Sequence, residues 1–322
     1  MDSSLSPYNS TSPCFGLTVE ECMFNNSPWE YRPSLALNSL LVGIFGASLA
    51  AHFIQGICWK TWGFFIAMVL GNVCEVIGYI GRIMAYNDIE GQNPFLIQIC
   101  CLTFAPAFFA AGIYLCLSRI VIVFGADISR IPPKWYTYIF VACDFFSLVL
   151  QGAGGGIAST AASANKSPQP GTNVMLAGLG FQVFTLVIFI ILCAEYAWRV
   201  MQRVKSGGQL DPVHAKLRQS KRFRGFLAAL AISTICILIR SIFRVVEMAE
   251  GWSGALMANQ TLFFVLEGVM VAVAVIILNL FHPGWCFAEG YSVSKNTSIK
   301  SDPTYDRGSE VEQEPAAHDD GA

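Results

Sequence analysis

Seven long apolar segments alternate with polar connections along the chain, and each is close to the roughly 20 residues that a helix needs to cross a ~30 Å hydrocarbon core. They lie at residues 34–54, 63–84, 95–123, 135–157, 172–194, 224–247 and 260–281. This pattern predicts an all-α polytopic membrane protein with seven transmembrane helices.

Pro106 stands in the middle of the third and longest segment. Proline has no backbone N–H and interrupts the hydrogen bonding of a helix, so we expect a kink at this position. We also expect a neighbouring helix to satisfy the carbonyl that the proline frees, because an unpaired carbonyl is costly inside a bilayer.

Basic residues gather in alternate connections between the apolar segments. Lys60, then Arg130 and Lys134, and then a group between residues 199 and 222 fall on one side, whereas the other side holds little beyond Lys166. Cytoplasmic loops carry an excess of Lys and Arg. We therefore expect the N-terminus outside and the C-terminus in the cytoplasm.

The polar N-terminal segment, residues 1–33, lacks the basic stretch and apolar core of a cleavable signal peptide, so we expect it to be retained outside the membrane. Asn9 and Asn25 stand in glycosylation acceptor patterns. Cys14 and Cys22 are close enough in sequence to bridge, which suits the oxidising side of the membrane.

The predicted membrane domain covers residues 34–285, and a tail follows at residues 286–322. The tail is acidic and almost free of large apolar residues. Such a composition cannot bury enough apolar surface to fold, so we expect a disordered cytoplasmic tail.

Ionisable side chains interrupt the sixth apolar segment on one helical face. Arg240, Arg244 and Glu247 stand at i, i+4 and i+7, so they form a single stripe. An ionised side chain near the bilayer centre costs from ~2.5 to more than ~10 kcal/mol, so this stripe must face protein or water. It is either a functional site or an ion-pair ladder that locks helices together.

Three other segments carry polar positions that match this stripe. The candidates for substrate binding or coupling are Glu75, Tyr79 and Arg82 in the second segment, Asp144, Ser147 and Gln151 in the fourth, Arg240, Arg244 and Glu247 in the sixth, and Glu267 in the seventh. At ~1.5 Å rise per residue, several lie roughly 18–24 Å from the inner boundary, and Asp144 lies nearer the midplane. Their charges nearly balance, which predicts a polar, solvent-reachable cavity in the outer half of the bundle.

A glycine-rich run follows Gln151 at residues 152–156. Glycines allow helix backbones to approach closely and also permit an unwound helix end, so tight packing and a gate are both open. Ile157 stands where a phosphate-binding Gly-x-Gly-x-x-Gly frame would need glycine, which argues against a phosphate loop.

The composition supports the membrane class and argues against several others. Of all residues, 54% are hydrophobic and 13% charged, against about 25% charged in soluble domains. No basic run is interleaved with aromatic residues, so nucleic acid is not an expected partner. The four histidines are scattered, nucleotide-binding motifs are absent, and residues 260–281 hold no lysine for a retinal Schiff base. We expect no metal, no cofactor and no enzyme activity.

Six motifs in order resemble the fungal lipid-translocating exporter family, the RTA-like resistance proteins. They are Glu75-Val-Ile-Gly78-Tyr79-Ile-Gly81-Arg82, Asp144-x-x-Ser147-x-x-x-Gln151-x-x-Gly154-Gly155-Gly156, Gly178-Leu179-x-x-Gln182, Glu195-Tyr196-x-x-Arg199, Arg240-Ser241-x-Phe243-Arg244-x-x-Glu247 and His282-Pro283-Gly284. The resemblance covers residues 34–285. One departure is Glu267, where the family pattern expects Asp.

The resemblance implies a seven-helix protein of the fungal plasma membrane that moves lipids such as sphingoid bases, or that gives resistance to toxic amphiphiles. Membrane lipids or amphiphilic small molecules are then the expected partners. Acidic side chains would hold the amine of a sphingoid base, and arginines would hold a phosphate or neutralise the empty site. The alternative is a seven-helix receptor or sensor of an amphiphilic ligand, which the same arrangement of helices and loops would suit.

Overall fold

The computed structural model describes residues 31–89, 91–164, 166–207, 210, 212–251, 256 and 259–287. Seven helices in these ranges are long and apolar enough to cross a membrane, one for each predicted segment. The prediction of an all-helical, seven-span membrane protein is confirmed. The glycosylation candidates Asn9 and Asn25, the Cys14–Cys22 pair and the predicted acidic tail lie outside the described residues.

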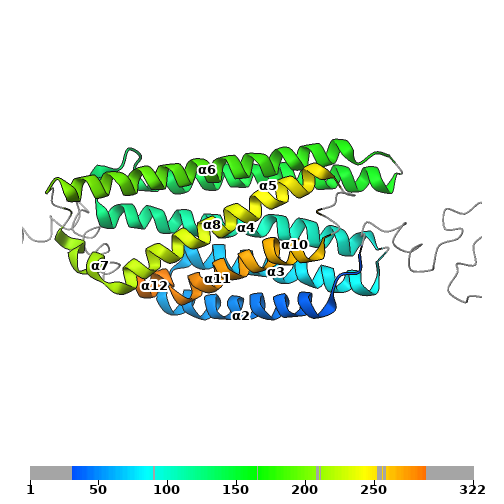
Figure 1. Cartoon of the computed structure of the whole chain (residues 1–322), viewed down its shortest axis with the longest axis horizontal. Helices are drawn as coiled ribbons and strands as arrows, with labels where there is room; N and C mark the ends of the chain where they lie inside the picture. Colours follow the sequence, from blue (N-terminus) through cyan, green and yellow to red (C-terminus); the bar gives the residue numbers. More distant parts are fainter. Residues whose placement is uncertain are drawn as a thin grey trace, which may run out of the picture.

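The elements carry the labels of Figure 1. The first six spans are α2 (Leu35–Trp59), α3 (Trp62–Asn87), α4 (Gln92–Phe124), α5 (Pro133–Ser163), α6 (Gln169–Lys205) and α8 (Lys221–Glu250). The seventh span combines α10 (Gln260–Phe263), the π-helix η3 (Phe264–Val269) and α11 (Met270–Leu280). The short elements are η1 (Ala126–Ile128), η2 (Pro212–His214), α7 (Ala215–Gln219) and α12 (Pro283–Cys286).

Most spans are longer than the apolar segments that predicted them. The clearest case is α6, which continues to Lys205 although its apolar segment ends at residue 194. Its last turns are stabilised by an ion pair four residues apart, in which Arg199 donates to Glu195 at 2.9 Å. Hydropathy identifies only the part of a helix that lies in the hydrocarbon of the membrane. Polar turns of this kind extend the helix past the apolar segment, so its end is not predicted from hydropathy.

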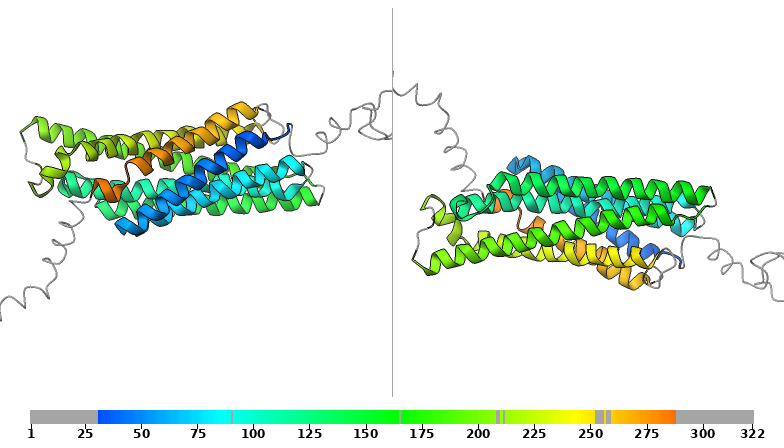
Figure 2. Two further views of the ribbon diagram at one scale, coloured as in Figure 1. Left: turned by 90° about the horizontal axis from the view of Figure 1, so that it is seen from below. Right: turned by 90° about the horizontal axis from the view of Figure 1, so that it is seen from above.

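The spans form a closed ring in which consecutive helices are neighbours, and α11 returns to pack against α2. α4 also reaches across the ring to contact α8, and it is the most buried of the seven spans. Figures 1 and 2 show the helices lying lengthwise side by side, with the start of α2 and α12 at opposite ends of the bundle. An odd number of spans requires this separation of the two ends.

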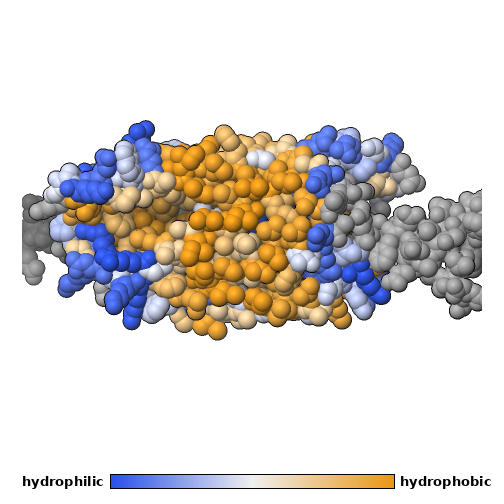
Figure 3. Space-filling view, viewed as in Figure 1, coloured by the Kyte–Doolittle hydropathy of each residue, from blue (hydrophilic) through white to orange (hydrophobic). Residues whose placement is uncertain are grey.

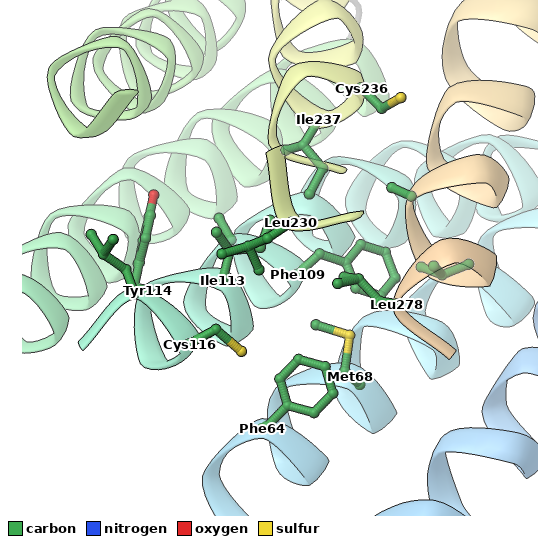
Figure 4. Close-up of a cluster of buried hydrophobic side chains, with 14 of the residues drawn as sticks. Phe64, Met68, Phe109, Ile113, Tyr114, Cys116, Leu230, Cys236, Ile237 and Leu278 are labelled. Atoms are coloured by element: carbon green, nitrogen blue, oxygen red, sulfur yellow. The ribbon is translucent and has the colours of Figure 1, made fainter. Parts of the chain in front are cut away.

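The core lies where α3, α4, α8 and α11 meet (Figure 4). Phe64 and Met68 of α3 face Phe109 of α4, and Leu230 of α8 and Leu278 of α11 close the group. Burying a large apolar side chain of this kind is worth about 1.5–3 kcal/mol against water, although within a bilayer close packing supplies most of the gain.

The outside of the bundle is apolar around its middle. Figure 3 shows a broad hydrophobic band with hydrophilic residues at both ends. Large apolar side chains of the spans face outward, including Phe145 at 67% exposure, Phe184 at 60% and Ile191 at 60%. A surface of this kind requires acyl chains rather than water around it, which agrees with the membrane class.

The glycine-rich run of α5 is helical throughout and packs tightly against α6. A Cβ atom added to Gly154 would lie 2.5 Å from the backbone nitrogen of Met175, and one added to Gly171 would lie 2.3 Å from that of Ala158. Of the two interpretations left open by the sequence, this geometry favours close backbone packing, as small residues allow between membrane helices.

The motif His282-Pro283-Gly284 forms the start of α12 and joins it to the end of α2. The ring Nδ1 of His282 accepts a hydrogen bond from the backbone nitrogen of Gly284 at 3.1 Å. A Cβ atom on Gly284 would lie 2.3 Å from that of Trp59. The motif therefore caps α12 and permits a close contact between this helix and the end of the first span.

Candidate functional site

Six buried side chains from α3, α8 and η3 form one group, which we call the arginine–glutamate cluster. Its members are Glu75, Tyr79, Arg240, Arg244, Glu247 and Glu267. None of them is more than 1% exposed. The polar stripes predicted on α3 and α8 therefore face the interior of the bundle and meet there.

Arg240 joins three elements of the bundle. Its Nη2 atom donates to Oε1 of Glu267 in η3 and to the carbonyl oxygen of Leu102 in α4. In a regular helix that carbonyl would accept from the backbone nitrogen four residues later, which here belongs to Pro106 and carries no hydrogen. The expected rescue of the freed carbonyl by a neighbouring helix is thus present, and Arg240 supplies it.

Arg244 lies one turn further along α8 and repeats this arrangement. It forms an ion pair with Glu247 on the same helix, and its Nη2 atom donates to the side-chain hydroxyl of Thr103 in α4 at 3.1 Å. The two arginines of α8 therefore bind consecutive residues of α4 beside the proline. Both acids that these arginines contact are satisfied at one oxygen.

Glu75 is the carboxylate of the cluster that lacks direct contacts. Among the described residues, neither of its oxygens has a hydrogen-bond partner. It interacts electrostatically with Arg240, Arg244 and Glu267 without touching them through a hydrogen bond. A buried polar group that makes no hydrogen bond is costly. Of the groups in the cluster, this carboxyl is therefore the best placed to accept a hydrogen bond from a ligand, or to bind a proton.

Tyr79 lies one turn from Glu75 on α3 and is fully buried. Its ring stacks on that of Phe45 in α2 with centroids 5.6 Å apart. Its hydroxyl has no hydrogen-bond partner among the described residues and lies 3.1 Å from where a Cβ atom on Gly268 would stand. The hydroxyl thus lies against the backbone of the seventh span, beside the turn that carries Glu267.

Glu267 and Gly268 belong to the π-helix η3. Single π turns inside α-helices are rare, and they occur frequently at functional sites. The wide turn presents the Glu267 carboxylate to Arg240, while its second oxygen makes no hydrogen bond within the described part of the chain. Glu267 is therefore a full member of the cluster.

Arg82 continues the stripe of α3 toward the end of the bundle where α2 begins. It donates to Asn38 at 3.1 Å, to Gln98 at 3.2 Å and to the hydroxyl of Tyr31 at 2.8 Å. Its guanidinium carbon lies 3.9 Å from the ring centroid of Phe263, a cation–π contact. Arg82 thus lies beside the cluster and links α2, α3, α4 and α10.

Asp144 belongs to a second polar group, held between α4, α5 and α6. Its carboxylate accepts from the hydroxyls of Tyr114 at 3.0 Å and Thr185 at 3.4 Å. The hydroxyl of Ser147 donates to the backbone carbonyl of Asp144 at 2.7 Å. Asp144 therefore has its hydrogen bonds supplied by two neighbouring helices, in contrast to Glu75.

Gln151 lies two turns further along α5 in this second group. Its amide donates to the side chain of Gln182 in α6 at 3.0 Å, and Thr185 donates to the backbone carbonyl of Gln182 at 2.9 Å. Among the described residues, this group and the arginine–glutamate cluster share no hydrogen-bonding partner. The sequence placed all ten candidates in one converging region, whereas the structure connects them as two groups with different partners.

Sequence reasoning missed the residues that complete both groups. Thr103, Gln98 and the carbonyl of Leu102 serve the arginines, and Tyr114 and Thr185 serve Asp144. Pro106 was the available signal, because its position identifies Leu102 as the freed carbonyl. The predicted solvent-reachable polar cavity stays a prediction. In the part of the chain that the structure describes, no group of three potential metal ligands is arranged to hold an ion.

The family model described as RTA1 like protein matches residues 68–290. The chain is 32% identical over 295 residues to the "Sphingoid long-chain base transporter RSB1" of Saccharomyces cerevisiae (strain Lalvin EC1118 / Prise de mousse), covering 84% of this chain and 76% of that protein. It is 31% identical over 238 residues to "Protoporphyrin uptake protein 1" of Saccharomyces cerevisiae (strain ATCC 204508 / S288c), covering 74% and 73% of the two chains.

A third relative is "Protein RTM1" of Saccharomyces cerevisiae, which is 29% identical over 219 residues and covers 68% of this chain and 67% of that protein. No solved structure matches the chain. Relatives described by transport or uptake do not favour the receptor alternative.

Proposed function

The chain belongs to the RTA1-like family, and from this membership we propose that it moves sphingoid-base-like lipids or toxic amphiphiles across the membrane, for export or resistance. The observation that carries the proposal is the similarity to a sphingoid long-chain base transporter over most of both chains. Seven apolar helices support an integral, multi-pass protein, and we place it in the plasma membrane as part of this proposal.

The charges of the arginine–glutamate cluster suit an amine headgroup. Glu267 pairs with Arg240 and Glu247 pairs with Arg244, which leaves Glu75 as the surplus acid. A long-chain base carries a cationic amine and hydroxyls on an apolar chain. We propose that Glu75 holds the amine through charge-assisted hydrogen bonds, with the hydroxyl of Tyr79 within reach of the substrate's own hydroxyls.

The deciding experiment follows a fluorescent long-chain base in liposomes that contain the purified full-length protein. Protein-free liposomes give the background rate of movement between leaflets. We expect the protein to accelerate this movement. A protein that binds the base without accelerating its movement would contradict transport and would support a sensing role instead.

Glu75→Gln tests the site separately from the function. A charge-assisted hydrogen bond contributes about 1.5–3 kcal/mol, so we expect the rate to fall about ten-fold or more. The fold should survive, because Glu75 gives no hydrogen bond to other described residues. The matched control is Glu250→Gln at the exposed end of α8, which should leave the rate unchanged. Equal rates in both variants would remove Glu75 from the site while leaving transport intact.

The orientation of the chain is also proposed. The basic loops share one end of the bundle, where Arg130 pairs with Glu195 at 2.9 Å and Arg203 pairs with Asp127 at 3.0 Å. Loops rich in Arg and Lys remain in the cytoplasm during insertion. We therefore infer that this end, which also carries α7 and α12, is cytoplasmic, and that the N-terminus is extracellular.

A further inference from the structure

A second candidate binding site lies on the side of the bundle, away from the arginine–glutamate cluster. The helices α4, α6 and α8 enclose a cavity of about 500 Å³. Figure 1 shows α8 inclined to α6, so that the two separate toward the end that carries α7. The lining is apolar, with Ile113, Phe189 and Leu227 as examples from the three helices. We call this cavity the side groove.

The side groove opens toward the bilayer. Met201 of α6 and Ile235 of α8 line it and are 54% and 52% exposed, and Ala231, one turn before Ile235 on α8, is also exposed. An opening at the level of the membrane spans faces acyl chains rather than water. A groove of this size lies within the range of ligand pockets, about 300–1,000 Å³.

The polar atoms at the wall of the groove are already used within the protein. The hydroxyl of Tyr196 donates to the carbonyls of Val121 and Gly125 at 3.2 Å, and the hydroxyl of Thr234 donates to the carbonyl of Leu230 at 2.7 Å. The wall therefore offers an occupant mainly apolar contact, and both of its hydroxyl hydrogens are already bonded within the protein. Such a wall fits a hydrocarbon chain and excludes a headgroup.

We call the end of the side groove that points toward α7 its mouth, and cations follow the lining residues there along both α6 and α8. Helical spacing continues its α6 face from Met201 to Lys205 and from Tyr196 to Arg203, and continues its α8 face back from Leu227 to Arg224. Lys205, Arg203 and Arg224 are all exposed. Arg203 pairs with Asp127 at 3.0 Å, so the mouth retains an excess of positive charge.

We propose that the side groove binds one acidic phospholipid, with an acyl chain between α6 and α8 and its phosphate at Lys205 and Arg224. Basic pockets between membrane helices bind acidic lipid headgroups in this way. The positive mouth would repel the ammonium group of a long-chain base, so this lipid is a resident one and is distinct from the transported molecule. This distinction rests on the proposed substrate, whereas the binding of an acidic phospholipid does not depend on the direction of transport.

The test is native mass spectrometry of the full-length protein extracted from liposomes of equimolar phosphatidylserine and phosphatidylcholine. We expect one phosphatidylserine retained per chain. Each of Lys205→Gln and Arg224→Gln should weaken its retention about five-fold, which corresponds to about 1 kcal/mol for each cation. Ala231→Phe should reduce retention of either lipid, because it fills the groove.

Matched controls are Lys134→Gln and Ala142→Phe on α5, both exposed and outside the groove, and neither should change retention. If Ala231→Phe fails to fold, the two exposed cations still decide the question. Equal retention of both lipids would identify ordinary surrounding lipid and overturn the proposal. Displacement of phosphatidylserine by an added long-chain base would also overturn it, because the groove would then hold the transported molecule.

Discussion

Arg240 donates a hydrogen bond to the carbonyl oxygen of Leu102, the carbonyl that Pro106 leaves without a donor in α4. The same guanidinium forms an ion pair with Glu267 in η3. One side chain of α8 therefore compensates for the proline of α4 and fixes the seventh span. The irregular turn of α4 and the charged stripe of α8 form a single structural unit.

Substituting Arg240 and Pro106 separately and together should show whether their contributions to stability are coupled. Arg240→Met leaves Glu267 buried without its cation, and we expect a loss of about 3–5 kcal/mol in stability. Adding Pro106→Ala supplies a backbone N–H to the carbonyl of Leu102, and should return about 1 kcal/mol. Thermal unfolding of the detergent-solubilised variants measures both changes.

The matched control for this rescue is Arg244→Met with and without Pro106→Ala. Arg244 binds Glu247 and Thr103, so an amide at position 106 replaces none of its contacts. A rescue of equal size in the Arg240 and Arg244 backgrounds would show that Pro106→Ala acts on the helix alone.

The Arg244–Glu247 pair should matter for transport as well as for folding. Either Arg244→Ala or Glu247→Ala leaves a buried charge without its partner, and we expect transport and resistance to be lost. The double variant Arg244→Met/Glu247→Gln removes both charges, and should recover much of the unfolding temperature without recovering transport. Normal surface expression with full activity in both single variants would refute a functional role for the pair.

Asp144 should act mainly as a link between helices. Asp144→Asn weakens the hydrogen bonds from Tyr114 and Thr185, so we expect a loss of about 1–2 kcal/mol in stability with transport retained. Tyr114→Phe should cost a similar amount, and the two losses should not add, because they remove the same contact. Altered substrate affinity or altered pH dependence of transport in Asp144→Asn would place Asp144 in the transport site instead.

The contact between α5 and α6 predicts opposite effects for two glycines of α6. Gly171→Ala brings a Cβ atom to 2.3 Å from a backbone nitrogen of α5, which cannot move without separating the helices, so we expect marked destabilisation. Gly180 has no atom within 4 Å of the same position, so Gly180→Ala should be neutral or stabilise by up to about 1 kcal/mol. Parallel melting curves of the two variants test this difference.

The proposed orientation predicts which ends are accessible from outside intact cells. A C-terminal tag should resist added protease, and Asn9 or Asn25 should be glycosylated or reached by an external probe. The control is the same treatment after the cells are permeabilised, which should remove the tag. Loss of the tag from intact cells would reverse the orientation.

Local patterns of the sequence account for the parts of this structure that were predicted. The number of spans follows from the lengths of the apolar segments. The burial of Glu75, Asp144 and Arg240 follows from the helical period, and both are properties of each segment alone. The partners of these residues depend on how each helix is rotated about its axis. Glu75 and Asp144 face different neighbours for this reason, and their polar stripes did not predict a shared site.

Two further features lay beyond the reach of the sequence. The extension of α6 to Lys205 depends on polar interactions outside the apolar segment, such as the Arg199–Glu195 pair. The π-helix η3 leaves no mark in composition, because its residues suit an α-helix equally well. It packs against α8, and Gly268 lies against Leu41 of α2 and Tyr79 of α3, contacts that only the assembled bundle provides.

The π-helix also affects how the seventh span can be compared among relatives. A turn with i→i+5 bonds holds one residue more than an α-helical turn. The helical pattern of buried positions before Phe264 is therefore offset by one residue from the pattern after Val269. A relative that lacks one residue within this stretch could keep both flanking faces in place with a regular helix. The segments before and after η3 should therefore be aligned separately, with a single-residue gap permitted within Phe264–Val269, before the residue that matches Glu267 is identified.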